Sequence, residues 1–228
     1  MKAYILTHDH PKSREYAKTC SKSCDLVDLD WEYFEGWSHC TGRMAWCQTG
    51  IKMKFHEPME YVAEPNMHHK ANTCSAGHAA IWKKIAEGKD TVGIVLEHDA
   101  IMYYKPDIKI PDNYLITLGY KLTELEYNYI EGNKQDRKII NIDGHEGAHA
   151  YMMTKRTAQN LIYEIEQKGI LGAVDNAYFI RGQRQTQIPL AIMSPTPAVG
   201  YLRESTIWDE SAHRNYEFID SFAPYSEI

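Results

Sequence analysis

Two acidic residues, Glu97 and Asp99, directly follow an apolar run in the sequence Ile94-Val95-Leu96-Glu97-His98-Asp99. Residues 91–96 are β-branched or apolar without alternation, which predicts a strand buried on both faces. Such strands belong to α/β proteins, where ligands bind beyond the carboxyl ends of the strands. Carboxylates placed there need a positive partner, and Mg²⁺ or Mn²⁺ prefers oxygen ligands of this kind. The alternative interpretation is a turn that carries two solvated acids.

The rest of the sequence predicts strands that alternate with helices, which is typical of a parallel sheet covered on both faces. We expect strands over 2–7, 24–28, 91–96, 114–118, 148–153 and 187–193, and helices over 13–19, 75–87, 154–167 and 174–180. Residues 29–70 show no clean period and predict an irregular insert or partly formed helices. Residues 120–137 predict a loop, and residues 201–228 a polar C-terminal tail. No linker divides the chain, so we expect one domain over 1–228, an α/β fold with a mostly parallel central sheet.

Composition restricts the functional classes. The chain of 228 residues is 43% hydrophobic and has a net charge of −6. The negative net charge argues against electrostatic binding of nucleic acid. No apolar run is long enough for a membrane span, and the first residues turn polar too soon for a signal peptide. The five cysteines are an odd number, so we expect free thiols and a cytoplasmic location. The Rossmann, P-loop and nucleophile-elbow glycine motifs are all absent from the sequence.

Three segments of the sequence together resemble glycosyltransferase family 25, which includes bacterial lipooligosaccharide galactosyltransferases and procollagen galactosyltransferases. They are 74–85 (CSAGHAAIWKKI), 94–100 (IVLEHDA) and 147–158 (GAHAYMMTKRTA). The opening residues 4–7 with Arg14, the pair at 174–175, and residues 205–207 are similar to further family elements. The resemblance covers roughly residues 1 to 207. The chain departs from the family pattern at Gly77, where the family has Ser, at His98, where it has Asp, and at Thr7, where it has Asn.

The resemblance implies a GT-A type fold and an inverting transfer of a hexose, galactose or glucose, from a UDP-sugar to a hydroxyl acceptor such as a glycan or lipooligosaccharide. It implies a Mn²⁺ or Mg²⁺ ion held by Glu97 and Asp99, with His213 as a further ligand. A general base must take the proton of the acceptor hydroxyl, a role typically worth about 10²–10⁴-fold in rate. Asp175 is our first candidate for this base, and Glu146 and Asp143 are the alternatives. Asp175 could instead be an acid that stabilises a helix N-terminus.

Four residues are predicted to contact the nucleotide sugar. Arg14 could pair with the phosphates, and His78 could touch the diphosphate; Thr7 and Asp28, each at a predicted strand end, could bind uracil or ribose. Each has a plainer alternative: a surface arginine, a buried core histidine, or a turn residue.

Three other functions remain open at this point. The chain could be a non-catalytic sugar- or nucleotide-binding module, as the departures at Gly77 and His98 suggest. It could glycosylate hydroxymethylated DNA bases, although its acidic charge makes nucleic acid an unfavourable partner. A zinc hydrolase is least favoured, because the spacing of Cys20 and Cys24 matches no standard zinc pattern. Peripheral association with a membrane is compatible with any of them.

Overall fold

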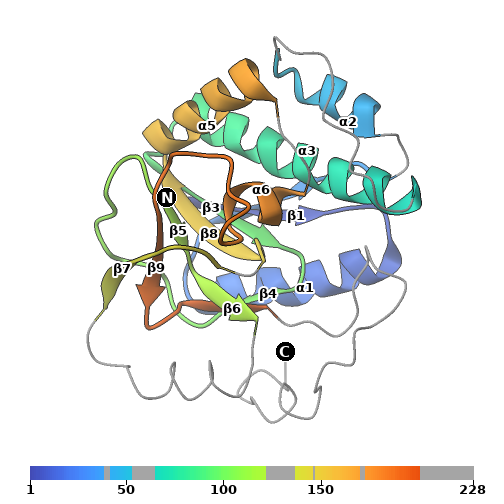
Figure 1. Ribbon diagram of the computed structural model, residues 1–228. Coiled ribbons are helices and arrows are strands. Elements are labelled where there is room, and N and C mark those ends of the chain that lie inside the picture. The colour runs from blue at the N-terminus through green and yellow to red at the C-terminus, as the bar shows by residue number, and fades with distance from the viewer. Residues whose placement is uncertain (39–41, 53–64, 122–136, 146, 170–172, 201–228) are drawn as a thin grey trace.

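The buried strand predicted before Glu97 lies inside a seven-stranded sheet (Figure 1). This computed structural model describes residues 1–38, 42–52, 65–121, 137–145, 147–169 and 173–200. The strand order is β2 (Trp31–Glu35), β1 (Lys2–Thr7), β3 (Val92–Glu97), β8 (Ala150–Thr154), β5 (Leu115–Thr117), β9 (Leu190–Ser194), β7 (Lys138–Ile142). Strands β2, β1, β3, β5 and β9 run in one direction, and β8 and β7 run against them. The predicted α/β fold with a mostly parallel sheet is therefore confirmed.

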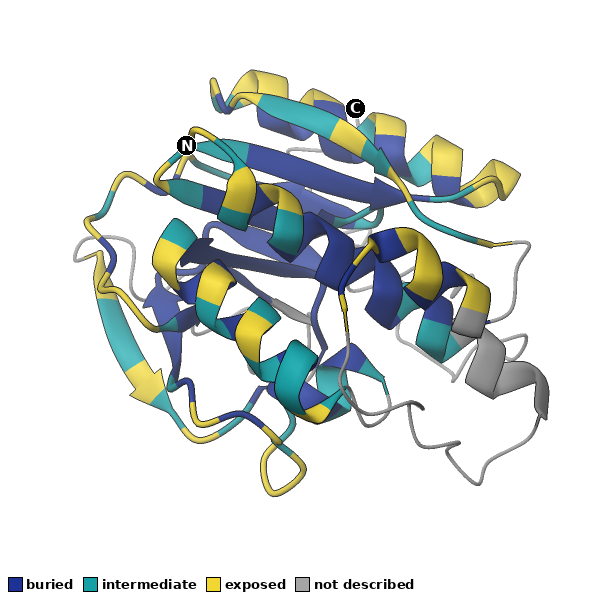
Figure 2. Cartoon of the chain, turned by 90° about the horizontal axis from the view of Figure 1, so that it is seen from above, coloured by how far each residue is buried: buried dark blue, intermediate teal, exposed yellow. Residues whose placement is uncertain are grey.

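Helices cover both faces of this sheet (Figure 2). Helix α1 (Pro11–Leu26) packs on the face that carries Ala3 and Ile5. Helices α3 (Pro65–Glu87) and α5 (Lys155–Lys168) pack on the opposite face, with Tyr4 and Leu6. Neighbouring residues of β1 thus alternate between two hydrophobic cores, as the pleat of a strand requires. Helix α2 (Gly42–Thr49) and the short α6 (Val174–Tyr178) pack against α3.

A second, three-stranded sheet lies beside the carboxyl end of β3. It has the order β4 (Ala100–Met102), β10 (Ala198–Gly200), β6 (Gly119–Lys121). Strand β4 begins directly after His98 and Asp99, which form the turn that follows β3. The turn that carries Asp99 is therefore held at both ends by strands.

Three sequence predictions need correction. The strand predicted at 24–28 is wrong, because α1 continues to Leu26 and buries small residues, Ala17, Cys20, Ser21 and Cys24, at helical spacing. The irregular insert predicted at 29–70 is wrong where the chain forms β2, whereas α2 and the start of α3 agree with the alternative of partly formed helices; residues 39–41 and 53–64 lie outside the described part. The loop predicted at 120–137 begins within β6, and residues 122–136 are not described, nor is the tail at 201–228.

Strand order reverses next to β1. The chain passes from β1 through α1 to β2 on one side, and β3 lies on the other side of β1. Leu6 of β1 is in register with Glu97 of β3, so both strands end at the same edge. In α/β sheets this reversal leaves a crevice beyond the carboxyl ends, where ligands bind. None of the helices in the described part is long and apolar enough to cross a membrane.

Candidate functional site

Glu97 is fixed at the end of β3 by its backbone and by a histidine. Its backbone N–H donates to the carbonyl oxygen of His149 at 2.8 Å, which continues the pairing of β3 with β8. One side-chain oxygen, Oε1, lies 3.2 Å from Nε2 of His78. The side chain of His78 is completely buried, whereas 28% of that of Glu97 is exposed. The carboxylate therefore has a fixed side toward α3 and an accessible side.

A chain of hydrogen bonds runs behind His78 into the core. Nδ1 of His78 lies 2.7 Å from the hydroxyl of Tyr151, and that hydroxyl also accepts from Nε1 of Trp82 at 2.7 Å. Because the indole N–H can only donate, the hydroxyl hydrogen of Tyr151 is available for Nδ1. His78 then carries its proton on Nε2 and donates it to Glu97. Each of these hydrogen-bonding groups has a partner, and Glu97 is the partner of Nε2 of His78. A contact of His78 with a diphosphate stays a prediction.

The site favours an ionised Glu97. Burial by itself would raise the pKa of Glu97, but the hydrogen bond from His78 lowers it, as do the electrostatic effects of the nearby His78, His149 and His98. The result is a pKa of about 2, well below the ordinary 4.5. Glu97 is therefore a carboxylate throughout the neutral range.

Asp99 and Asp175 act electrostatically on the same thiol as Glu97. Burial, followed by the negative charges of Glu97, Asp175 and Asp99, raises the pKa of Cys74 well above its usual range. We call these three carboxylates the acidic site. Glu97 and Asp99 come from the end of β3, Asp175 from the first turn of α6, and Cys74 from α3.

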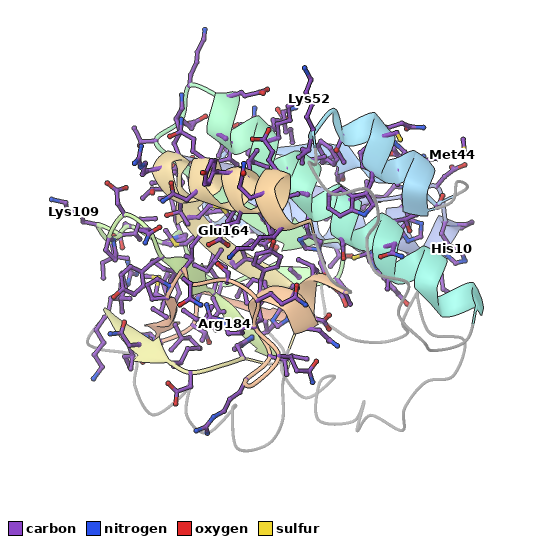
Figure 3. The ribbon with its side chains drawn as sticks, turned by 45° about the horizontal axis from the view of Figure 1, so that its top comes forward. His10, Met44, Lys52, Lys109, Glu164 and Arg184 are labelled. Carbon is purple, nitrogen blue, oxygen red and sulfur yellow. The ribbon has the colours of Figure 1, made fainter. Side chains whose placement is uncertain are left out.

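Aromatic packing holds α6 and its Asp175 against the sheet and α3. The rings of Tyr178 and Trp82 lie 4.8 Å apart, and those of Phe179 and Tyr151 lie 5.0 Å apart. Arg184, labelled in Figure 3, donates from Nε to the carbonyl of Tyr178 at 2.9 Å. The main-chain N–H of Asn176 donates to Oδ1 of Asp175 at 2.9 Å, so that one carboxylate oxygen is oriented by the helix start.

The donor set fits a hard divalent cation. Glu97 remains ionised and presents an accessible side, and Asp99 and Asp175 add negative charge nearby. Carboxylate oxygens are the ligands that Mg²⁺ and Mn²⁺ prefer. The sequence also predicted His213 as a ligand, but this residue lies outside the described part of the chain.

The predicted nucleotide ligands are distributed over both edges of the sheet. Thr7 lies at the carboxyl end of β1, where its hydroxyl is 3.1 Å from that of Ser13 in the first turn of α1. Arg14 lies at the same edge, half-exposed and paired with Asp9 at 3.1 Å and Glu35 at 2.9 Å. Figure 3 labels His10, which begins α1 here.

Asp28 is not brought to this edge. It follows α1 in a left-handed conformation (φ 54°) and precedes β2, so it lies at the amino ends of the strands. Its fully exposed carboxylate is 3.3 Å from Nζ of Lys105. The acid at the carboxyl end of β2 is instead Glu35, which the sequence analysis did not select because it placed the second strand too early.

The alternative bases are separated from the acidic site or not described. Asp143 is 81% exposed, and its carboxylate lies 3.6 Å from the guanidinium of Arg181. Glu146 is outside the described residues. Asp175 acts electrostatically on Cys74 together with Glu97 and Asp99, and Asp143 is not among the groups that do so.

Two of the three departures from the family pattern, Gly77 and His98, have structural reasons. A Cβ atom added at Gly77 would lie 3.0 Å from Cδ1 of Leu6, so the glycine allows α3 to approach β1 closely. His98 stacks on the ring of Tyr16, with centroids 6.0 Å apart, and meets the ring of His8 edge-on at 5.8 Å. His98 therefore packs toward α1, while Glu97 before it faces α3.

The sequence analysis missed Cys74 and Tyr151 as site residues. Cys74 and His78 are four residues apart, a spacing that places both on one face of a helix, and this signal was available in the sequence. Tyr151 stands in a fully buried strand, where its hydroxyl needs a hydrogen-bond partner. Its partners come from α3, about 70 residues away in sequence, and no local pattern identifies them.

Removal of the Tyr151 hydroxyl should destabilise the protein. In Tyr151→Phe, Nε1 of buried Trp82 loses its acceptor, and Nδ1 of His78 loses its donor. An unsatisfied buried polar group costs about 1–3 kcal/mol, and we expect the free energy of unfolding in urea to fall by that amount. The control is Tyr163→Phe, since Tyr163 is 63% exposed. A stability equal to that of the control would contradict the hydrogen-bond chain.

The low pKa of Glu97 also predicts a dependence of stability on pH. Because the pKa falls from 4.5 to about 2 on folding, the ionised group stabilises the folded state fully above pH 4.5. This stabilisation is lost as the pH falls from 4.5 toward 2. Each pKa unit corresponds to about 1.4 kcal/mol, so the gap in unfolding free energy between wild type and Glu97→Gln should shrink by on the order of 3 kcal/mol over this range. A gap independent of pH would refute the assignment.

The chain was compared with known proteins by sequence and by structure. No family model and no curated protein matches it. Among solved structures it is similar to the galactosyltransferase LgtC in complex with donor and acceptor sugar analogs, at 12% identity over 72% of this chain and 62% of that one, with a TM-score of 0.37. It is also similar to the glycosyltransferase GlyE of Streptococcus pneumoniae TIGR4, at 9% identity over 99% of this chain and 61% of that one, with a TM-score of 0.44.

A third similar structure is a glycosyltransferase involved in glycosylation of the major capsid of PBCV-1, at 14% identity over 72% of this chain and 66% of that one, with a TM-score of 0.33. The chain thus spans about three fifths to two thirds of these proteins. All three are glycosyltransferases, but superpositions with such low TM-scores carry no functional argument. The resemblance to family 25 remains a prediction from the sequence.

Proposed function

We propose that this protein is a GT-A type glycosyltransferase that moves a hexose, galactose or glucose, from a UDP-sugar to a hydroxyl acceptor such as a glycan. The observation that carries the proposal is the acidic site. Glu97 and Asp99 lie at the carboxyl end of β3, at the reversal of strand order, and Asp175 acts on the same thiol as they do. Glu97 is kept ionised by the hydrogen bond from His78. Such a concentration of negative charge at a ligand-binding edge suits a cation and the diphosphate that it would bind.

Different residues of the chain would bind the metal ion, orient Glu97 and accept the proton of the acceptor hydroxyl. Glu97 and Asp99 would hold a Mn²⁺ or Mg²⁺ ion, which when bound supplies positive charge to the leaving diphosphate. His78, backed by Tyr151 and Trp82, fixes the carboxylate of Glu97 in one orientation. Asp175 would take the proton of the acceptor hydroxyl, and the hydroxyl oxygen would then attack the anomeric carbon from the face opposite the diphosphate, with inversion.

Hydrolysis and transfer assays with UDP-galactose, UDP-glucose and UDP-N-acetylglucosamine, with and without Mn²⁺, test this proposal. We expect Mn²⁺-dependent release of UDP from at least one of the two hexose donors. Binding of a UDP-sugar without any turnover would favour a non-catalytic binding module. Absence of binding by every donor, measured as an unchanged melting temperature, would reject the proposal.

A further inference from the structure

Cys74, His78 and Glu97 form a cluster that the transfer reaction does not use in full. Cys74 and His78 lie one turn apart on α3, and both face Glu97 at the end of β3. The thiol sulfur, a ring nitrogen and a carboxylate oxygen lie within 4.8 Å of one another. We propose that these three side chains form a binding site for a thiophilic divalent cation, with Zn²⁺ as the ion whose chemistry fits best.

The ligand types favour zinc over magnesium or manganese. Zn²⁺ binds thiolate, imidazole and carboxylate together, whereas Mg²⁺ and Mn²⁺ take oxygen ligands. Three protein ligands leave one tetrahedral position open for water or another ligand. Asp99 and Asp175, which act electrostatically on Cys74, add negative charge that attracts any cation to this point.

The three ligand atoms must move slightly closer together to bind a zinc ion. With bond lengths of about 2.0–2.3 Å, ligand atoms around tetrahedral zinc lie roughly 3.5 Å apart. Cys74 and Glu97 are both partly exposed, so their side chains can close the gap by rotation. His78 is the fixed ligand, because Tyr151 holds its Nδ1 at 2.7 Å. Metal-binding histidines usually have such a partner on the second ring nitrogen.

Binding of the ion changes the protonation of Cys74 and the tautomer of His78. The thiol of Cys74 releases its proton to solvent as sulfur becomes a thiolate ligand. The proton on Nε2 of His78 moves to Nδ1, which then donates to the hydroxyl oxygen of Tyr151. Nε2 is left free to bind the ion, and one proton is released for each ion.

Glu97 would serve this site and also the proposed Mn²⁺ or Mg²⁺ site. If the proposed function is correct, zinc at Cys74 therefore excludes the donor-binding ion and inhibits transfer. The zinc site itself does not depend on that function, and it can be tested without any nucleotide sugar.

Cobalt provides a direct spectroscopic probe of the site. We expect the purified protein to bind one Co²⁺ ion with a sulfur-to-metal charge-transfer band in the near ultraviolet, and added Zn²⁺ to abolish the band. Cys74→Ser should lose the band. The matched control is Cys47→Ser, which should keep it, because Cys47 is an exposed free thiol on α2, the helix whose Met44 is labelled in Figure 3.

Alkylation of the wild-type protein provides a second measurement that needs no variant. Excess Zn²⁺ should slow the reaction of Cys74 with iodoacetamide at least ten-fold and leave that of Cys47 unchanged, as read by peptide mass spectrometry. A wild-type protein without the charge-transfer band, or equal labelling of Cys74 with and without zinc, would overturn the proposal. Neither result bears on glycosyl transfer, so the two proposals fail separately.

Discussion

Replacement of Asp99 by alanine is expected to abolish the Mn²⁺-dependent part of UDP-sugar binding. Asp99 lies in the turn between β3 and β4, and it acts electrostatically on Cys74, as do Glu97 and Asp175. Without it, a hard cation loses one of its two proposed carboxylate ligands. We expect the dissociation constant for the donor in the presence of Mn²⁺ to rise at least ten-fold, about 1.4 kcal/mol, with no change in its absence.

Isothermal titration with UDP in the presence and absence of Mn²⁺ measures this effect. Asp112→Ala is a matched control, because Asp112 is exposed and precedes β5 at the opposite edge of the sheet. Both variants remove one negative charge, so a general change in the protein's field would affect them alike. Unchanged Mn²⁺-dependent binding in Asp99→Ala would remove Asp99 from the metal site.

The central sheet was predictable where its strands are buried on both faces. Residues 92–96 and 150–153 are continuous runs without charged residues, and they are followed by a turn and by an amphipathic helix, respectively. The edge strand β2 could not be predicted in the same way. Its residues Trp31 to Glu35 mix charged and aromatic side chains, because the strand lies at the edge of the sheet and pairs with one strand, β1.

Helix α1 shows a different limit of sequence reasoning. Its buried face is built from Ala, Ser and Cys rather than from large apolar residues, so its hydrophobic period is weak. Residues 13–19 were recognised as helix, whereas the last residues of α1, 24–26, were taken for the start of a strand. That single error also moved the expected ligand-binding acid from the true end of β2 to Asp28.

The candidate site was predictable in part, for an equally physical reason. Glu97 and Asp99 could be found because an abrupt change from apolar to acidic residues marks the end of a buried strand. The partners of Glu97 come from α3 and β8, whose distance from β3 is set by tertiary packing. The hydrogen bonds of His78, Tyr151 and Trp82 therefore become visible only in the folded protein.

Substitution of Asp175 by asparagine should separate catalysis from binding. Asparagine has the shape of aspartate and can still accept the hydrogen bond from the N–H of Asn176, so α6 should stay intact. It cannot take a proton from the acceptor hydroxyl. We expect kcat for transfer to fall by about 10²–10⁴-fold, the usual contribution of a general base, while Mn²⁺-dependent binding of the donor stays unchanged.

The same assay on Asp143→Asn and Glu146→Gln distinguishes among the three candidate bases. Asp143 is strongly exposed and paired with Arg181, so its variant should keep nearly full activity. A large loss of kcat in Glu146→Gln, with Asp175→Asn active, would transfer the role of base to Glu146 and leave Asp175 as an acid that orients the start of α6. Loss of donor binding in Asp175→Asn would instead make Asp175 a third ligand of the cation, because a general base contributes to the proton transfer and not to the grip on the diphosphate.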